Sequence, residues 1–325
     1  MSVMTLVKAI NNALDIKLEE NKDVVVFGED VGYEGGVFRV TQGLQQKYGA
    51  ERVFDSPLAE SGIVGTAVGM AVAGLRPVIE MQFSGFAYPG FNQMISHVSR
   101  MRNRSRGKYT SSMVIRMPYG GGIKALEHHS ESMEALYAHI PGLKVVIPST
   151  PHDAKGLLIS AIESEDPVIY MEPKRIYRAV KQEVADEKFK MQIGKANVVQ
   201  QGTDITVVSY GAMMRDVQKA LAMAKKAGIS VELIDLRTIY PMDKETIASS
   251  IKKTGRILSV TEAPQSFGPG AEIMSVANEE AFLYLEAPPK RVTGYDTIFP
   301  LPQGEHHYLP SPEKIYYEIE KTVKF

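Results

Sequence analysis

One acidic side chain, Glu60, lies at the beginning of a long apolar stretch, in the segment FDSPLAESGIVG. Residues 63–75 (IVGTAVGMAVAGL) follow it and contain no charged or large polar side chain. In the first turn of a helix, a carboxylate opposes the helix dipole and contributes about 0.3–1 kcal/mol. Pro57 and Leu58 make the preceding segment stiff and apolar, and Ser61 is an alternative cap. Glu60 is therefore either a helix-start acid or a carboxyl group placed for chemistry.

A pair of histidines, His128 and His129, lies between acidic residues in the segment LEHHSE. Adjacent residues of a regular element face apart, and the chain has no His-Glu-x-x-His spacing, so a shared metal ion is disfavoured. Two interpretations stay open: a surface loop, or one catalytic histidine at the carboxyl edge of a parallel sheet. Residues 120–122 (GGG) precede the pair and are either a turn or a backbone approach to an anion. A second pair, His306 and His307, is predicted to lie in a surface loop.

The elements that must position these side chains alternate between apolar strands and helices. A helical pattern covers residues 153–164, and alternation of this kind predicts right-handed crossovers and a mostly parallel, doubly wound α/β sheet. Buried strands are predicted from β-branched apolar runs at residues 24–27, 77–83, 113–117, 144–148 and 167–172.

A second, smaller α/β domain is predicted from the C-terminal part of the sequence. Residues 180–202 are polar without a strong period, and we expect a linker there with one short strand. The predicted boundaries are residues 1–185 for the first domain, 186–202 for the linker and 203–325 for the second domain. Strands are expected in this second domain at residues 205–209, 231–236, 256–260 and 291–293, with helices through 219–226 and from about 271.

Composition limits the classes of function. The 325 residues carry a formal net charge of −1 and no cysteine, which argues against a nucleic-acid binder and excludes disulfides and thiolate metal sites. The longest apolar run is too short to span a membrane, and the N-terminal segment lacks a secretory pattern, so we expect a cytoplasmic protein or a mature organellar form. Gly65 and Gly69 permit close backbone approach, and a helix that is apolar on all sides is expected to be buried on all sides, which favours an oligomer.

Several longer motifs carry a family resemblance from about Met4 to the end of the chain. They are GEDVG, GGVFRVTQGL, FDSPLAESGIVG, the histidine of EHHSES, PGLKVVIPSTPHDAKGLL, IDLRTIYPMD and KTGRILSVTEAP. The sequence resembles the β subunit of the thiamine-diphosphate-dependent, decarboxylating first component of 2-oxo acid dehydrogenase complexes. This resemblance implies a transketolase-like fold, with an N-terminal pyrimidine-binding domain and a transketolase C-terminal-like domain.

The resemblance also assigns roles to side chains. In the family, the glutamate that matches Glu60 hydrogen-bonds the pyrimidine ring of the cofactor and favours the tautomer that activates the thiazolium carbon. Phe86 matches an aromatic residue that packs on this ring, although core packing alone would also explain it. Glu29 matches an acidic residue between two active sites, and Leu58 is expected beside the cofactor. His129, and not His128, matches the histidine that transfers protons to the intermediate or to the lipoyl group.

Two ions are implied by the resemblance. Superfamily members that hold the diphosphate through Mg²⁺ carry a Gly-Asp-Gly motif, which is absent from this sequence, so an α subunit is expected to hold Mg²⁺. The active site would then lie at a subunit interface of an α2β2 heterotetramer. Relatives also hold K⁺ through main-chain oxygens, which correspond here to Ser111, Met113, Val114, Ala161, Ser164 and Asp166.

The implied activity is oxidative decarboxylation of a 2-oxo acid, followed by reductive acylation of a lipoyl group. The segments HHSES, EPKRIYRA and LEAPPKRVTGYDTIFP favour a branched-chain 2-oxo acid, with pyruvate or acetoin as the alternative substrate. The lipoyl-bearing acyltransferase component is expected to bind through the C-terminal domain. A different class of function, a non-catalytic scaffold subunit, is disfavoured by the presence of Glu60 and His129.

Overall fold

A computed structural model describes residues 1–325, and they divide into two compact units. The first unit comprises Met1–Tyr119 and Leu136–Ile193, and the second comprises Gly120–Ala135 and Gly194–Phe325. Both units contain parallel strands covered by helices, which confirms the predicted α/β class. None of the helices has the length and apolar character that crossing a membrane requires.

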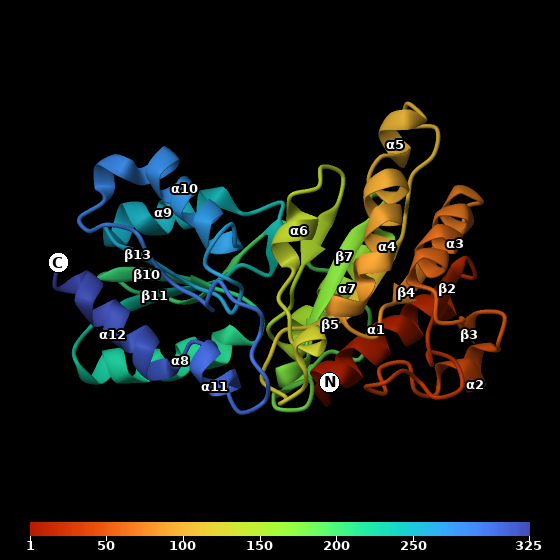
Figure 1. The fold of residues 1–325 in the computed structure, drawn as a ribbon, viewed down its shortest axis with the longest axis horizontal. Coiled ribbons are helices and arrows are strands. Elements are labelled where there is room, and N and C mark those ends of the chain that lie inside the picture. Colours follow the sequence, from red (N-terminus) through yellow and green to blue (C-terminus); the bar gives the residue numbers. More distant parts are fainter. The chain divides into compact units, whose positions relative to one another are not determined.

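The first unit is built on a parallel sheet with the strand order β6-β7-β5-β4-β2-β3 (Figure 1). All five residues of β2 are buried, as expected for an apolar strand covered on both faces. The elements are β1 (Ser2–Thr5), α1 (Leu6–Glu20), β2 (Val24–Gly28), α2 (Leu44–Tyr48), β3 (Val53–Asp55), α3 (Glu60–Val72), β4 (Arg76–Glu80), η1 (Ser84–Ala87), α4 (Tyr88–Gln93), η2 (Met94–Val98), α5 (Met101–Arg104), β5 (Val114–Tyr119), β6 (Lys144–Val146), α7 (Pro151–Glu163), β7 (Val168–Pro173), η4 (Lys174–Ile176) and β8 (Lys181–Val184).

The second unit has a five-stranded sheet of order β14-β13-β10-β11-β9, in which only β9 is antiparallel to its neighbour. Figure 1 shows α9 and α10 on one face of this sheet and α8 and α12 on the other. Its elements are η3 (Glu127–His129), β9 (Asn197–Gln200), β10 (Ile205–Ser209), α8 (Met213–Lys226), β11 (Val231–Asp235), β12 (Thr238–Tyr240), α9 (Lys244–Thr254), β13 (Ile257–Val260), α10 (Pro269–Ala281), η5 (Phe282–Tyr284), β14 (Lys290–Val292), α11 (Glu305–Tyr308) and α12 (Pro312–Val323), while α6 (Glu134–Ala138) crosses the division between the units.

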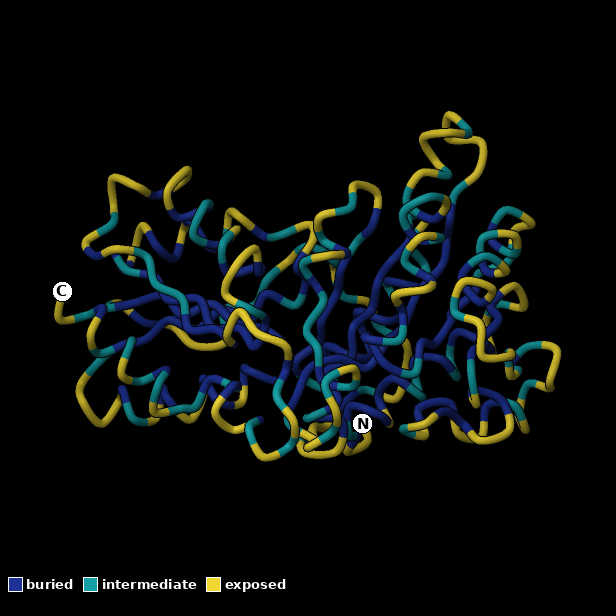
Figure 2. The backbone as a smooth tube through the Cα atoms, in the orientation of Figure 1, coloured by how far each residue is buried: buried dark blue, intermediate teal, exposed yellow.

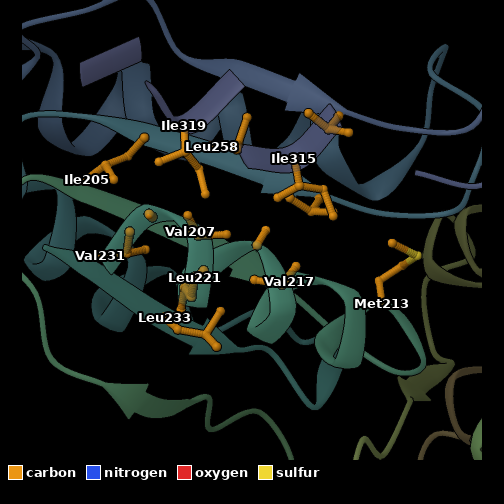
Figure 3. Close-up of a cluster of buried hydrophobic side chains, with 14 of the residues drawn as sticks. Ile205, Val207, Met213, Val217, Leu221, Val231, Leu233, Leu258, Ile315 and Ile319 are labelled. Carbon is orange, nitrogen blue, oxygen red and sulfur yellow. The ribbon is translucent and has the colours of Figure 1, made fainter. Parts of the chain in front are cut away.

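The core of the second unit explains why these elements assemble. Ile205 and Val207 of β10 pack with Val217 and Leu221 of α8 and with Ile315 of α12, and all of them are buried (Figure 3). The central strands of each sheet are buried along most of their length, and many exposed residues lie in the connections (Figure 2). Burial of apolar side chains on both faces therefore stabilises the sheet, and the loops that follow the strands form its carboxyl edge.

The polar segment 180–202 is more regular than predicted. We expected one short strand, but β8 and β9 both form there. β8 pairs with β1 in an antiparallel ribbon, and β9 pairs with β11 of the second sheet. Edge strands expose half of their side chains to water, so a polar sequence is compatible with both.

The apolar helix α3 is only partly buried within this chain. Ile63, Val64, Ala67 and Ala71 are buried, whereas Ser61, Gly62, Thr66 and Gly69 are exposed. Nothing in the chain lies within 4 Å of a Cβ built at Gly69, so no strand of this chain approaches this glycine closely.

Candidate functional site

Glu60 is the first residue of α3, as the helix-start interpretation requires. The N-cap is Ala59, which provides no side-chain hydrogen bond, so Ser61 is not the cap. The Ser61 hydroxyl instead donates to the main-chain oxygen of Pro89, at 2.5 Å. A Cβ at Gly90 would lie 3.2 Å from the main-chain oxygen of Glu60, so α4 packs closely against the first turn of α3. This packing fixes the backbone that carries the Glu60 carboxylate.

Glu29 follows β2 in a loop that the neighbouring strands hold tightly. Gly28 has a φ of +156°, and a Cβ there would lie 2.4 Å from the main-chain oxygen of Glu80, so only glycine fits. The Asp55 carboxylate accepts from the main-chain N–H groups of Gly32 (2.7 Å) and Tyr33 (3.3 Å). The loop is thereby anchored to the carboxyl end of the adjacent strand β3.

The two acids that sequence analysis found separately lie close enough to interact. Burial raises the pKa of the Glu29 carboxyl, and repulsion from Glu60 and then from Asp30 raises it further. Glu29 and Glu60 come from the loops that follow the neighbouring strands β2 and β3. The carboxyl edge of this sheet therefore concentrates acidic groups at one place, where open α/β sheets bind ligands.

The aromatic residue Phe86 lies in the short helix η1, which follows the next strand, β4. Its ring is half-buried and packs edge-on against Phe83, with 5.3 Å between the ring centroids, and Phe83 in turn packs against Phe38. Leu58 is 78% exposed, just before α3. Phe86 thus belongs to an aromatic cluster and remains partly exposed.

His129 lies at the end of η3, whereas Glu60, Glu29 and Phe86 belong to the first unit. Its main-chain N–H donates to Leu126, at 3.0 Å. His129 is half-buried and the adjacent His128 is exposed, so the two side chains face different surroundings. The chain contains no group of three or more His, Cys, Asp and Glu side chains arranged to hold a metal ion.

The second histidine pair is exposed, but it does not lie in the predicted loop. His306 and His307 belong to α11, and their ring centroids are 3.8 Å apart. The prediction of a surface position is confirmed, and the prediction of a loop is wrong. Gly304 precedes this short helix and Leu309 ends it.

The segments expected to hold K⁺ lie next to each other in the first unit. The Ser112 hydroxyl donates to the main-chain oxygen of Glu165, at 3.1 Å, and thereby joins the two segments. Three of the six main-chain oxygens, at Ser111, Met113 and Ala161, each accept a main-chain N–H, and a carbonyl oxygen keeps a second lone pair. The buried hydroxyl of Ser111 has no hydrogen-bond partner. Unused oxygen donors of this kind are compatible with a bound cation.

The other three residues expected to hold K⁺ already form contacts within the chain. Val114 pairs with Val168 in the ladder between β5 and β7. The Ser164 hydroxyl donates to the main-chain oxygen of Asp166, at 2.8 Å. The Asp166 carboxylate forms ion pairs with Arg102 (2.8 Å) and Lys144 (3.3 Å), so its charge is balanced without an added ion.

A buried charged cluster joins the neighbouring strands β4, β5 and β7 and was not predicted from the sequence. Arg116 donates to Glu172 at 2.7 Å and to Glu80 at 2.8 Å, and the Tyr177 hydroxyl donates to Glu172 at 2.6 Å. Arg116, Glu80 and Glu172 are at most 3% exposed. Burial raises the pKa of Glu80, although Arg116 opposes this. The charged residue within the apolar strand MVIRM was the available signal, because a buried charge needs a partner.

Comparisons with known proteins give consistent matches over the whole chain. Residues 2–180 match the family "Transketolase, pyrimidine binding domain", and residues 194–315 match "Transketolase, C-terminal domain". The protein named "Pyruvate dehydrogenase E1 component subunit beta" of Acholeplasma laidlawii is 59% identical, over 100% of this chain and 99% of its own length. Proteins of the same name are 51% identical in Mycoplasma genitalium (98% of each chain) and 50% identical in Staphylococcus epidermidis (100% of each).

A solved structure described as "Split gene transketolase, inactive beta4 tetramer" has a TM-score of 0.81, at 22% identity and 99% coverage of both chains. At this level of identity the likeness concerns the fold alone. It confirms the transketolase-like arrangement predicted from the sequence motifs.

Proposed function

We propose that this chain is the β subunit of the first component (E1) of a pyruvate dehydrogenase complex. It belongs to the transketolase-like β subunits of the first component of 2-oxo acid dehydrogenase complexes. The observation that carries this proposal is 50–59% identity, over the full length, to proteins named for pyruvate. These relatives favour the alternative substrate over the branched-chain 2-oxo acid that three sequence segments favoured. The proposed reaction is oxidative decarboxylation of pyruvate and reductive acylation of a lipoyl group.

The family depends on thiamine diphosphate, which supplies the electron sink for decarboxylation when it is bound. Glu60 fits a role at the pyrimidine ring, since α4 fixes its helix turn and Glu29 adds a second carboxyl group nearby. In our proposal, Glu60 donates or accepts the proton at a ring nitrogen, and the accessible part of Phe86 packs on the ring. Leu58 provides apolar contact at the same edge of the sheet, and its 78% exposure leaves it free to do so.

We assign His129 to proton transfer during the acylation of the lipoyl group. An imidazole titrates near neutral pH, and it therefore both donates and accepts protons under physiological conditions. The half-buried position of His129, in contrast to the exposed His128, supports this choice between the two. The lipoyl-bearing acyltransferase component is proposed to dock on the C-terminal domain.

The quaternary arrangement that we propose is an α2β2 heterotetramer, with the α subunit holding Mg²⁺ and the diphosphate. The absence of Gly-Asp-Gly and the exposed small residues of α3 support a partner subunit. We retain K⁺ bound by main-chain oxygens of residues 111–114 and 161–166, the domain boundaries at residues 185 and 203, and a cytoplasmic location as further proposals.

Activity of the reconstituted pair tests this function. The chain is co-expressed with an α subunit, and decarboxylation of pyruvate, decarboxylation of 2-oxoisovalerate and C–C cleavage of acetoin are each measured with a lipoyl domain as the acceptor. We expect the highest kcat/KM with pyruvate. A preference for 2-oxoisovalerate would restore the branched-chain substrate, and an assembled pair without activity on any of the three would support a scaffold.

A further inference from the structure

The segment that carries His129 is attached to the second unit. Gly120–Ala135 directly follows β5 of the first unit, yet it groups with Gly194–Phe325 by its contacts. The main-chain N–H of Gly120 donates to the main-chain oxygen of Glu131, at 3.0 Å, which closes the segment into a loop. The sequence motifs assigned no site residue to Gly194–Phe325, so the contacts between this part of the unit and the loop need an explanation of their own.

The first contact with this loop is made by the carboxylate of Glu262, which lies two residues beyond the end of β13. It accepts the main-chain N–H of Gly121, at 2.9 Å, and Glu262 is 3% exposed. A Cβ at Gly120 would lie 2.9 Å from both carboxylate oxygens, and one at Gly121 would lie 2.4 Å from the ring of Phe299. Gly120 and Gly121 thus allow close packing against Glu262 and Phe299. A charge-assisted hydrogen bond to a buried main-chain N–H is strong and directional.

The second contact is the hydrogen bond between Tyr210 and Glu134. Tyr210 follows β10, the strand next to β13, and its hydroxyl donates to Glu134 Oε1, at 2.7 Å. Glu134 is fully buried, and its Oε2 has no hydrogen-bond partner. Burial raises the pKa of Glu134 to about 7, the Tyr210 hydroxyl opposes this rise, and Glu262 adds to it. The Tyr210 hydroxyl is therefore the hydrogen-bond partner that fixes this buried carboxyl group.

A third contact lies on the other side of the loop. The main-chain N–H of Lys124 donates to the carboxylate of Glu305 in α11, at 3.1 Å. Lys124 has a φ of +56°, a conformation that side-chain-bearing residues rarely adopt without support. The three contacts, made by Glu262, Tyr210 and Glu305, lie on both sides of η3, the short helix that ends in His129.

We propose that Glu262 and the Tyr210–Glu134 pair are positioning residues, by which the C-terminal unit places His129 for the acylation of the lipoyl group. This inference rests on the proposed function, because it needs His129 to act in that step. Tyr210 and Glu262 follow neighbouring strands at the carboxyl edge of the second sheet, so two rigid elements orient one catalytic loop. The C-terminal unit would then contribute to chemistry as well as to docking.

The test uses the full chain assembled with its α subunit and compares two half-reactions. Decarboxylation is measured with an artificial electron acceptor, and acylation with a free lipoyl domain. Glu262→Ala removes both acceptor oxygens, Glu262→Gln keeps one, and Tyr210→Phe removes only the hydroxyl. The matched control is Glu232→Ala, which removes a buried acid of the same unit whose partners are Ser250 and Lys253 of α9.

We expect Glu262→Ala to lower acylation about 10-fold or more, with decarboxylation and the KM for pyruvate nearly unchanged. Glu262→Gln and Tyr210→Phe should lose less, and Glu232→Ala should leave the ratio of the two half-reactions as in the parent. Hydrogen exchange of residues 120–135 should quicken in Glu262→Ala and Tyr210→Phe but not in the control. Adding Glu262→Ala to His129→Ala should cause no further loss, because positioning acts through the histidine.

Three results would overturn the inference. The first is that hydrogen exchange and acylation stay unchanged in both Glu262→Ala and Tyr210→Phe. The second is that these variants lose decarboxylation and acylation equally. The third is that the losses in acylation multiply when Glu262→Ala is combined with His129→Ala. The proposed function fails separately. If His129→Ala alone leaves acylation intact, the histidine assignment is wrong, whereas an impaired His129→Ala beside unaffected Glu262 and Tyr210 variants defeats the positioning role alone.

Discussion

At the scale of single residues, Glu60 is the first residue of a helix and also lies near a second acid, Glu29. Glu60 begins α3, as the helix-start interpretation requires, and it also lies close enough to Glu29 to raise the pKa of that carboxyl. The two roles differ in magnitude. An acid in the first turn contributes about 0.3–1 kcal/mol to stability, whereas a positioned acid–base group commonly contributes a factor of about 10²–10⁴ to rate.

Glu60→Gln is therefore expected to fold, to assemble with the α subunit and to lose about 10²–10⁴ in decarboxylation rate. The amide is nearly isosteric with the carboxylate but cannot take part in the same proton equilibrium. Steady-state rates and thermal unfolding midpoints of the assembled protein provide the measurement. Glu51→Gln, which changes an exposed acid before β3, serves as the control. Activity within a few-fold of the parent would leave Glu60 only its role in the helix.

His129→Ala is expected to impair acylation of a free lipoyl domain more than it impairs cofactor binding. The reason is its half-buried position on a loop that is held at three places. His128→Ala removes an imidazole of the same size one residue away, and the exposed position of His128 predicts a mild effect. Acyl transfer is measured for both variants at matched cofactor saturation. Similar mild losses in the two variants would contradict a catalytic role.

A candidate site residue could be predicted from the sequence only where its immediate neighbours in the chain marked it. Glu60 stands out beside an apolar run, and His129 is part of a distinctive motif. Glu262 and Tyr210 carry no local signal, because their meaning comes from contacts with a loop 141 and 76 residues away in the sequence. The raised pKa of Glu134 likewise depends on burial, which a single sequence does not reveal.

At the scale of elements, strands with continuous apolar runs were predictable and edge strands were not. β10 matches the predicted residues 205–209, because it is buried throughout and flanked by turns. β8 and β9 were largely hidden in a polar segment, since an edge strand satisfies only one side of its backbone within the sheet. The fold class followed from the central strands, and two strands formed in the polar segment where one was expected, because an edge strand is defined by its pairing partners.

Helices α1 and α7 are joined by a charged cluster that predicts acid sensitivity. Burial would raise the pKa of Glu163, but hydrogen bonds from Lys17, Lys188 and Lys190 outweigh burial and lower it to about 2. A carboxyl group with a lowered pKa contributes stability that is complete above its unfolded pKa of 4.5 and is lost as the pH falls toward 2. The contribution is roughly 1–2 kcal/mol after allowance for solvent screening.

Glu163→Gln is accordingly expected to lower the unfolding midpoint at pH 7 and to flatten the loss of stability between pH 4.5 and 2. Chemical unfolding of the chain at several pH values measures both effects. Glu165→Gln changes an acid that is 71% exposed and pairs with Arg102, so it should have a smaller effect. If the two variants show the same acid profile, the cluster around Glu163 does not stabilise the helix pair.

Glu134 predicts the opposite dependence on pH in the second unit. Its pKa is raised from 4.5 to about 7, so the folded state binds a proton that the unfolded state releases, and stability falls as the pH rises between these values. The loss is roughly 3 kcal/mol as an upper bound. Glu134→Gln keeps a neutral side chain facing Tyr210 and Glu262, and it should remove this slope between pH 5 and 7.5. Identical slopes for parent and variant would contradict a buried, protonated Glu134.

At the scale of the whole molecule, the sequence contains Glu60, which we propose for the pyrimidine ring, but lacks the Gly-Asp-Gly motif that holds the diphosphate in the superfamily. A cofactor with two chemically different ends needs both halves of a site, because each end loses its hydration when it binds. Exposed small residues on α3 leave backbone surface that another subunit can approach. These two features together indicate that the isolated chain is incomplete as a catalyst.

The purified chain alone is therefore expected to bind thiamine diphosphate poorly, even with Mg²⁺ present, and the assembled pair is expected to bind it tightly. Calorimetry on both samples measures the difference. A ligand at 100 times its dissociation constant stabilises a folded protein by about 2.7 kcal/mol, so unfolding midpoints give an independent readout. The pair should be stabilised by the cofactor and the single chain should not. Micromolar binding to the chain alone would contradict the two-subunit site, because it would mean that this chain holds the diphosphate without Gly-Asp-Gly.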